Sequence, residues 1–86
     1  MNVRDLIKEG VALFKNKKFD EAIEKLNQAL DGVEDKNSQI QEQNEIQSWL
    51  GRCYFEQAMQ AEGEDSERLF EQAVEHFQQW LHLAKQ

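Results

Sequence analysis

Proline is absent from this chain, and glycine occurs at only four positions. These two residues are the strongest helix breakers, whereas Glu, Gln, Lys, Leu and Ala, which dominate the composition, are good helix formers. The balance favours helices over strands, and with 86 residues we expect one all-α domain, residues 1–86, with a modest core.

Cysteine occurs once, at Cys53. A single cysteine excludes a framework of intramolecular disulfides and fits a reducing compartment. Free cysteines are among the residues most often buried, so we interpret Cys53 as a small core residue rather than a reactive or metal-binding thiol.

Long apolar runs are also missing. The longest one, from Val11 to Phe14, is far shorter than the ~20 residues that a membrane-spanning helix needs. Charged residues, including Arg4, Asp5 and Lys8, fall where the apolar core of a signal peptide would lie. We therefore expect a soluble, cytoplasmic protein with no membrane partner.

Basic residues are outnumbered, with 10 Lys and Arg against 17 Asp and Glu, which gives a formal net charge of -7. Residues 1–36 hold seven basic and eight acidic residues, a balance of -1, whereas residues 37–86 hold three and nine, a balance of -6. The acidic second half argues against nucleic acid or an anionic membrane as the partner. We expect instead a partner protein with a basic or neutral surface.

The first part of the chain predicts a helical hairpin over about residues 2–33. Asn2 is a suitable N-cap, Asn16 is expected to adopt the left-handed conformation of a short basic turn, and Gly32 is placed to end the second helix. Apolar residues recur at intervals of three and four, which is the pattern of a buried helix face. They include Val3, Leu6, Ile7, Val11, Phe14, Phe19, Ala22, Ile23, Leu26, Ala29 and Leu30.

A second, less regular hairpin is predicted over about residues 38–85. Its first helix would run from residue 39 to residue 62, and its early turns are rich in glutamine, so we expect them to be solvated or reserved for a partner. At 1.5 Å per residue this helix measures ~36 Å against ~20 Å for the first one, so it must overhang its neighbour. The predicted architecture is four antiparallel helices in two helix-turn-helix hairpins.

Cap residues mark the predicted ends of these longer helices. Residues 34–37 are predicted to form a polar loop, and Ser38 is predicted to be the N-cap after it. Gly63 is expected to end the long helix, and Asp65 or Ser66 is expected to cap the last one.

Small residues lie at fixed spacings between large apolar ones in the first hairpin, with Gly10, Ala22 and Ala29 beside Leu13 and Leu26. This arrangement resembles the tetratricopeptide (TPR) repeat, in which such small residues let two helices approach closely. The resemblance implies TPR-like superhelical packing and a non-catalytic role in protein-protein interaction, as an adaptor or scaffold.

A second copy of the TPR pattern is matched only in part, by Leu50, Gly51 and Tyr54 and then by Ala73 and Phe77. The interval from Gly51 to Ala73 is 22 residues, whereas the interval from Gly10 to Ala22 is 12. The ten additional residues must lengthen the helices and their connection.

Residues that could carry catalysis or bind a metal are few. His76 and His82 are six residues apart, roughly 120° around a helix, and cannot easily bind one metal together. Glu71 with Glu75, and Gln72 with His76, are interpreted as exposed helical neighbours. We therefore expect no enzyme activity, no metal and no cofactor.

The TPR resemblance implies that the first helix of each hairpin offers an exposed edge to a peptide or helix of a partner protein. Phe14 and Phe55 are the best candidates for apolar anchors; the alternative is that both are ordinary core residues. The TPR subfamily that binds the acidic tails of chaperones has Lys and Asn where Ile7 and Val11 stand, so we reject that function. The predicted binding residues are Arg4, Ile7, Val11, Phe14, Lys15, Ser48, Arg52, Phe55 and Glu56.

The competing prediction is self-association. The last helix carries an aromatic stripe with Phe70, Phe77 and Trp80 that must be covered by the long third helix, by a second subunit or by a further domain. A homodimer formed through the last two helices would cover it, with these three residues as the interface.

Overall fold

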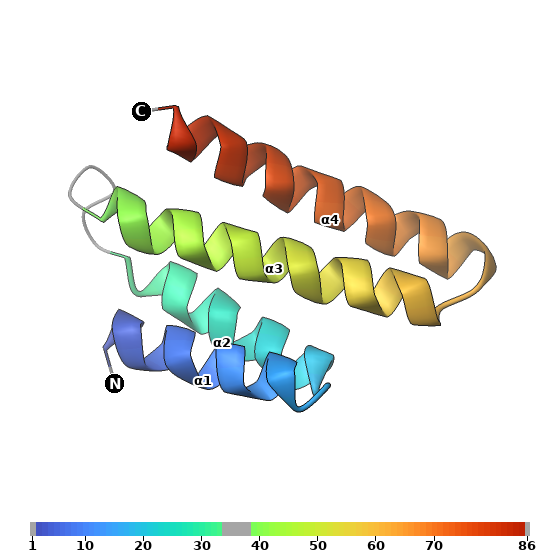
Figure 1. Ribbon diagram of the computed structural model, residues 1–86, viewed down its shortest axis with the longest axis horizontal. Helices are drawn as coiled ribbons and strands as arrows, with labels where there is room; N and C mark the ends of the chain where they lie inside the picture. Colours follow the sequence, from blue (N-terminus) through green and yellow to red (C-terminus); the bar gives the residue numbers. More distant parts are fainter. Residues whose placement is uncertain (1, 34–38, 86) are drawn as a thin grey trace.

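The computed structural model describes residues 2–33 and 39–85, and within them it contains four α-helices and no strand. Consecutive helices run in opposite directions (Figure 1). The all-α prediction is therefore confirmed, whereas the predicted loop 34–37 and the predicted cap Ser38 lie outside the described residues. The helices are α1 (Val3–Lys15), α2 (Phe19–Asp31), α3 (Ile40–Gln60) and α4 (Gly63–Ala84).

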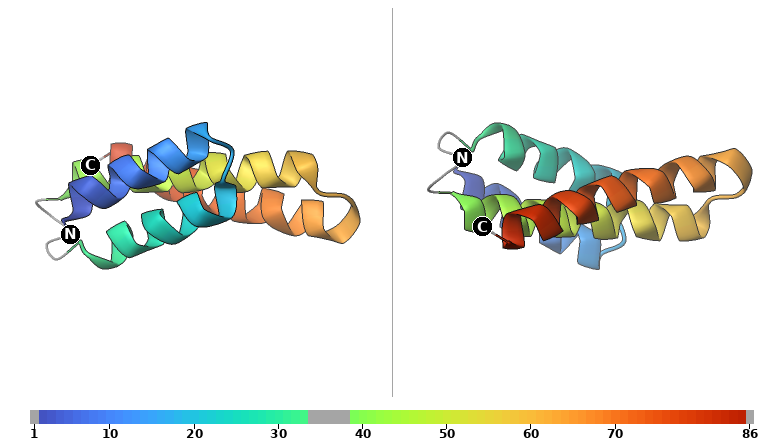
Figure 2. Two further views of the ribbon diagram at one scale, coloured as in Figure 1. Left: turned by 90° about the horizontal axis from the view of Figure 1, so that it is seen from below. Right: turned by 90° about the horizontal axis from the view of Figure 1, so that it is seen from above.

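α3 is the central element of the fold. It packs against α1, α2 and α4, whereas α4 contacts only α3 among the described helices. Figures 1 and 2 show that α3 and α4 are the long pair and that the C-terminal end of α3 extends past the end of the first hairpin, as predicted. None of the helices in the described ranges is long and apolar enough to cross a membrane.

The turn between α1 and α2 is made by Lys17, whose φ of 63° is left-handed. Asn16 keeps a φ of -89°, and its N–H still bonds the carbonyls of Ala12 and Leu13, so the prediction that Asn16 is left-handed was wrong. The Lys18 N–H donates to the Leu13 carbonyl at 2.9 Å. A bond of this kind is typical of a helix that ends in a left-handed residue, here Lys17. The chain therefore turns at Lys17, one residue later than expected.

The connection between α3 and α4 also differs from its prediction. α3 ends at Gln60, and α4 begins at Gly63, whose φ of +64° is left-handed, so this glycine starts a helix rather than ending one. Ser66 lies within α4, where its hydroxyl donates to the Ala58 carbonyl of α3 at 2.9 Å. Neither Asp65 nor Ser66 caps α4, because the extended backbone at residues 61 and 62 places the helix start earlier.

The core consists of small and branched side chains at the junction of α1, α2 and α3. Ala22, Leu26 and Ala29 of α2 are fully buried, and they meet Ile46 and Leu50 of α3. Apolar burial of this kind is the main favourable term in folding. The remaining members of the core cluster are Leu6, Ile7 and Cys53.

Two glycines allow the helices to approach closely. A Cβ placed on Gly10 would lie 2.8 Å from Leu26 Cγ, and one placed on Gly51 would lie 2.7 Å from Phe77 Cε1. Both distances are shorter than a van der Waals contact, so α1 lies directly against α2, and α3 against α4, at these points. The expectation that a partner helix packs against the bare backbone of Gly10 is confirmed.

These contacts predict the effect of alanine at each glycine. Alanine favours a helix over glycine by ~1 kcal/mol, but overpacking a core typically costs about 1–3 kcal/mol. Leu26 is fully buried and cannot move aside, whereas Phe77 is only half-buried. We therefore expect Gly10→Ala to lower the free energy of unfolding, and Gly51→Ala to lower it less. Urea denaturation followed by circular dichroism measures both, and an unchanged or higher stability of Gly10→Ala would contradict the packing described.

Candidate functional site

A shallow groove of about 330 Å³ runs between α1 and α3. Its apolar lining comes from Ile7, Val11 and Ala12 of α1 and from Trp49 of α3. The charged residues that line it are Arg4, Lys8, Lys15 and Glu45. We call this surface the α1–α3 groove, and it brings together four residues that the sequence predicted, namely Arg4, Ile7, Val11 and Lys15.

The sequence-based prediction missed four residues that line the groove: Lys8, Ala12, Glu45 and Trp49. Trp49 has the largest side chain among them. Its ring packs edge-on against Phe14, with ring centroids 5.2 Å apart and an angle of 68° between the planes. The Arg52 guanidinium lies 4.6 Å from the centroid of the Trp49 ring, a cation–π distance. The signal in the sequence was the three-residue spacing of Trp49 and Arg52, which places both on one side of a helix.

Phe14 does not form an exposed anchor. It is half-buried, and besides Trp49 it contacts Phe19 edge-on, with centroids 5.4 Å apart. Phe14 therefore packs against Trp49 but does not itself line the groove. Phe55 is 42% exposed and contacts Phe70 of α4, with centroids 5.6 Å apart, so the two predicted anchors serve different parts of the molecule.

Ile7 was predicted to be exposed, and this prediction was wrong. Only 3% of Ile7 is exposed, because this position of α1 faces the core cluster and leaves only an edge in the groove. Three further predicted residues of α3 do not line the groove: Arg52 is exposed beside Trp49, and Ser48 and Glu56 are half-buried.

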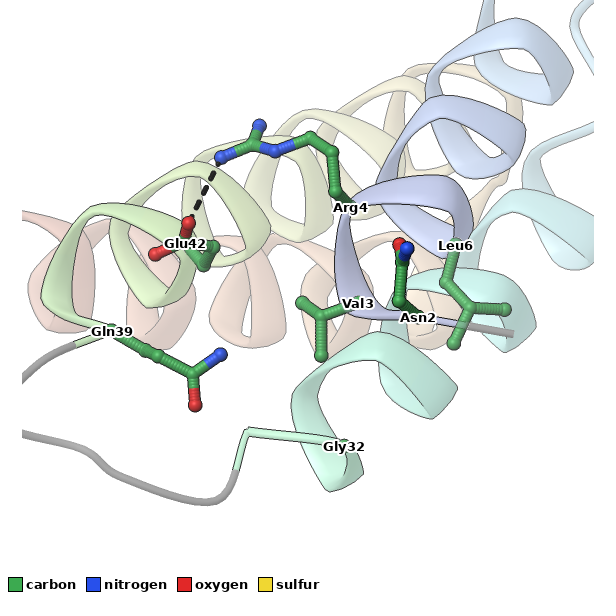
Figure 3. A pocket seen from close by; sticks show the side chains of 7 residues that line it. All are labelled: Asn2, Val3, Arg4, Leu6, Gly32, Gln39 and Glu42. Atoms are coloured by element: carbon green, nitrogen blue, oxygen red, sulfur yellow. Dashed lines mark hydrogen bonds and ion pairs between the residues drawn. The ribbon is translucent and has the colours of Figure 1, made fainter.

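Arg4 closes one end of the groove by binding two carboxylates of α3. Its guanidinium donates to Glu45 Oε2 at 2.6 Å and to Glu42 Oε1 at 3.2 Å. Figure 3 shows the bond between Arg4 of α1 and Glu42 of α3. The view is centred on a second hollow, which Arg4 and Glu42 also line. The hydrogen bond with Glu45 is the main reason that the pKa of Arg4 is raised, so its charge is retained.

The early turns of α3 are half-buried against neighbouring helices rather than solvated, although Gln41 is exposed. Glu42 and Glu45 bind Arg4, and Ile46 is fully buried. On the other side, the Asn44 side chain donates to the Trp80 carbonyl of α4 at 2.9 Å. The polar composition of this segment suggested exposure to solvent. Several of its polar side chains instead bind groups on α1 and α4.

Two of the three residues of the second predicted interface line a hollow on α4. This hollow of about 320 Å³ is lined entirely by α4, with Val74, Phe77, Trp80 and Leu81 as its apolar residues and Gln78 beside them. Val74 is 51% exposed and Leu81 is 49% exposed. We call these four apolar residues the α4 strip. Phe77 and Trp80 were predicted, whereas Phe70 contacts Phe55 instead.

The groups with catalytic potential are engaged in packing. Burial raises the pKa of the Cys53 thiol to about 12, so it remains protonated. His76 stacks on Tyr54, with ring centroids 5.3 Å apart, and its Nδ1 hydrogen bonds Gln47 Oε1 rather than Gln72. No group of three or more His, Cys, Asp or Glu that could hold a metal occurs in the part of the chain that the structure describes.

His76 predicts a pH dependence of stability. Burial lowers the pKa of His76 below its ordinary value of 6.5, and the charge of Glu75 opposes this only in part. The folded protein therefore binds a proton at His76 less readily than the unfolded chain does. The contribution of His76 to the free energy of unfolding should therefore be constant well above pH 6.5 and should decrease as the pH falls below that value.

Denaturant titrations between about pH 7.5 and pH 5 measure this decrease, and the variant His76→Gln should lose most of it. His82→Gln is the matched control on the same helix and should retain the decrease. An equal pH dependence in wild type and His76→Gln would contradict the assignment.

Comparison with known proteins leaves the function to be argued from this geometry. The chain matches no protein-family model, no curated protein and no solved structure.

Proposed function

We propose that this protein is a non-catalytic interaction module that binds a helix of a partner protein in the α1–α3 groove. The observation that carries the proposal is Trp49, which stands half-buried at the groove beside Val11 and Ala12 with the Arg52 guanidinium over its ring. Trp and Arg are enriched among the residues that contribute most to protein-protein binding.

The orientation of the two helices supports this proposal. α1 and α3 run in the same direction (Figure 1), and the groove between them is lined by apolar and charged side chains. An amphipathic helix can lie in such a groove and bury its apolar face there. The resemblance of the first hairpin to a TPR repeat agrees with this proposal, because TPR arrays hold partners along the first helices of successive repeats.

The non-catalytic part of the proposal is supported by the state of the reactive groups. Cys53 is buried and protonated, and His76 is bonded to Gln47 and stacked on Tyr54. Neither arrangement supplies a nucleophile next to a base in an accessible pocket.

A groove-filling substitution tests the proposal. Ala12 is exposed and lines the groove, so Ala12→Trp should fill it without disturbing the core. Gln28→Trp places the same side chain on the exposed face of α2 and serves as the matched control. We expect wild type and Gln28→Trp to retain the same proteins from the native cell extract in a quantitative pull-down, and Ala12→Trp to lose at least one of them. Equal capture by all three would contradict binding in the groove.

Self-association through the α4 strip is the second candidate function. It is favoured by the exposure of Val74, Trp80 and Leu81 on a helix that has α3 as its single neighbour among the described helices. Exposed apolar patches of this kind mark interaction sites.

Sedimentation equilibrium at micromolar concentration decides on this candidate. If it holds, the wild type is a dimer and Leu81→Glu is a monomer, because a charge would then be buried in the interface. A wild type that remains a monomer excludes it.

A further inference from the structure

We infer that the α1–α3 groove selects an acidic amphipathic helix of a separate partner protein, an inference that rests on the proposed function. Of the two apolar surfaces described above, the groove is the one whose lining includes cations. Arg4, Lys8 and Lys15 contribute three positive charges to its lining, and Glu45 contributes the single negative charge.

The two lysines are available to a partner. Both are exposed, and no carboxylate of the described residues lies within 4.0 Å of either ammonium group. Glu45, the acidic group of the lining, is already bound to Arg4 at 2.6 Å. The excess of positive charge in the groove is therefore carried by Lys8 and Lys15.

Arg52 extends this charge along α3. It is exposed, its guanidinium lies over the Trp49 ring, and it makes no ion pair within the described part of the chain. Lys8 and Lys15 are seven residues apart, which corresponds to about two turns or ~10 Å along the helix axis. A partner helix with carboxylates at the same seven-residue spacing can reach both lysines.

The charges of the groove, rather than the net charge of the chain, determine which partner helix is preferred. The chain carries -7 overall, which led to the expectation of a basic or neutral partner. At physiological salt, however, charges separated by more than about 8 Å are largely screened from each other. Charges in contact with the bound helix therefore decide its preference, and those of the groove are mainly positive.

A second copy of this chain is the less favourable occupant. The α4 strip and the α1–α3 groove are different surfaces, so their pairing would be head-to-tail and would leave one surface of each kind open at the ends. The occupant proposed is therefore a helix of another protein, with apolar residues on one face and Glu or Asp beside them.

Two synthetic peptides of about five turns test this inference. They share one stripe of Leu and Ile at helical spacing and differ only in the flanking positions, which are Glu in the first and Lys in the second. Affinity is measured by fluorescence anisotropy at low and at physiological salt. Because each exposed ion pair contributes little, we expect wild type to prefer the Glu peptide by about three- to tenfold at low salt, and less at higher salt.

Charge-neutral variants link this preference to the groove. Lys8→Gln/Lys15→Gln should lose most of the preference, since glutamine is a good helix former and keeps α1 intact. Lys18→Gln/Lys85→Gln changes the net charge equally at exposed sites that do not line the groove, and it should keep the preference. Circular dichroism confirms that both variants are folded.

The outcomes separate this inference from the proposed function. The inference is overturned if wild type shows no preference for the Glu peptide, or if Lys8→Gln/Lys15→Gln keeps that preference unchanged. If Ala12→Trp still abolishes binding of both peptides in that case, the groove remains the binding site. Binding of neither peptide to wild type also overturns the inference, and the proposed function is then decided by the capture experiment. Concentration-dependent self-association that Ala12→Trp abolishes would identify a second copy as the occupant and overturn the choice of a separate partner.

Discussion

The burial of one face of α3 is the constraint on which the rest of the structure depends. Ile46, Leu50 and Cys53 are fully buried there, and the two larger side chains each contribute on the order of 2 kcal/mol. Because α1, α2 and α4 all pack on α3, loss of this helix would leave the first hairpin and α4 without a common core. The close contacts at Gly10 and Gly51 bring the helices near enough for that burial.

A short chain organised around one central helix leaves surfaces open beside it. α1 and α4 make no contact with each other in the described residues, so the exposed side of α3 lies between them. On the α1 side this produces the groove with Trp49, and on the other side α4 is left with an exposed apolar strip. Both candidate surfaces therefore arise because α1 and α4 pack on α3 without contacting each other.

Electrostatics then distinguishes the two surfaces. Arg4 ties α1 to the start of α3 by binding Glu42 and Glu45, and its single positive charge offsets one of these two negative charges. Lys8 and Lys15 remain as the exposed charges of the groove, whereas the α4 strip is lined by uncharged residues alone. An acidic protein thus presents a locally basic groove, which a net charge cannot reveal.

The all-α class, the helices of the first hairpin and the role of its small residues could be predicted from the sequence, because helical periodicity and the need for close approach are local properties. Gly10 against Leu26 is the clearest case. Only the tertiary structure decided that Ile7 is buried, that Glu42 and Glu45 bind Arg4, and that Trp49 stands at the groove. The physical reason is that a helical pattern specifies which side chains share a face, whereas the neighbouring helices determine which face is covered.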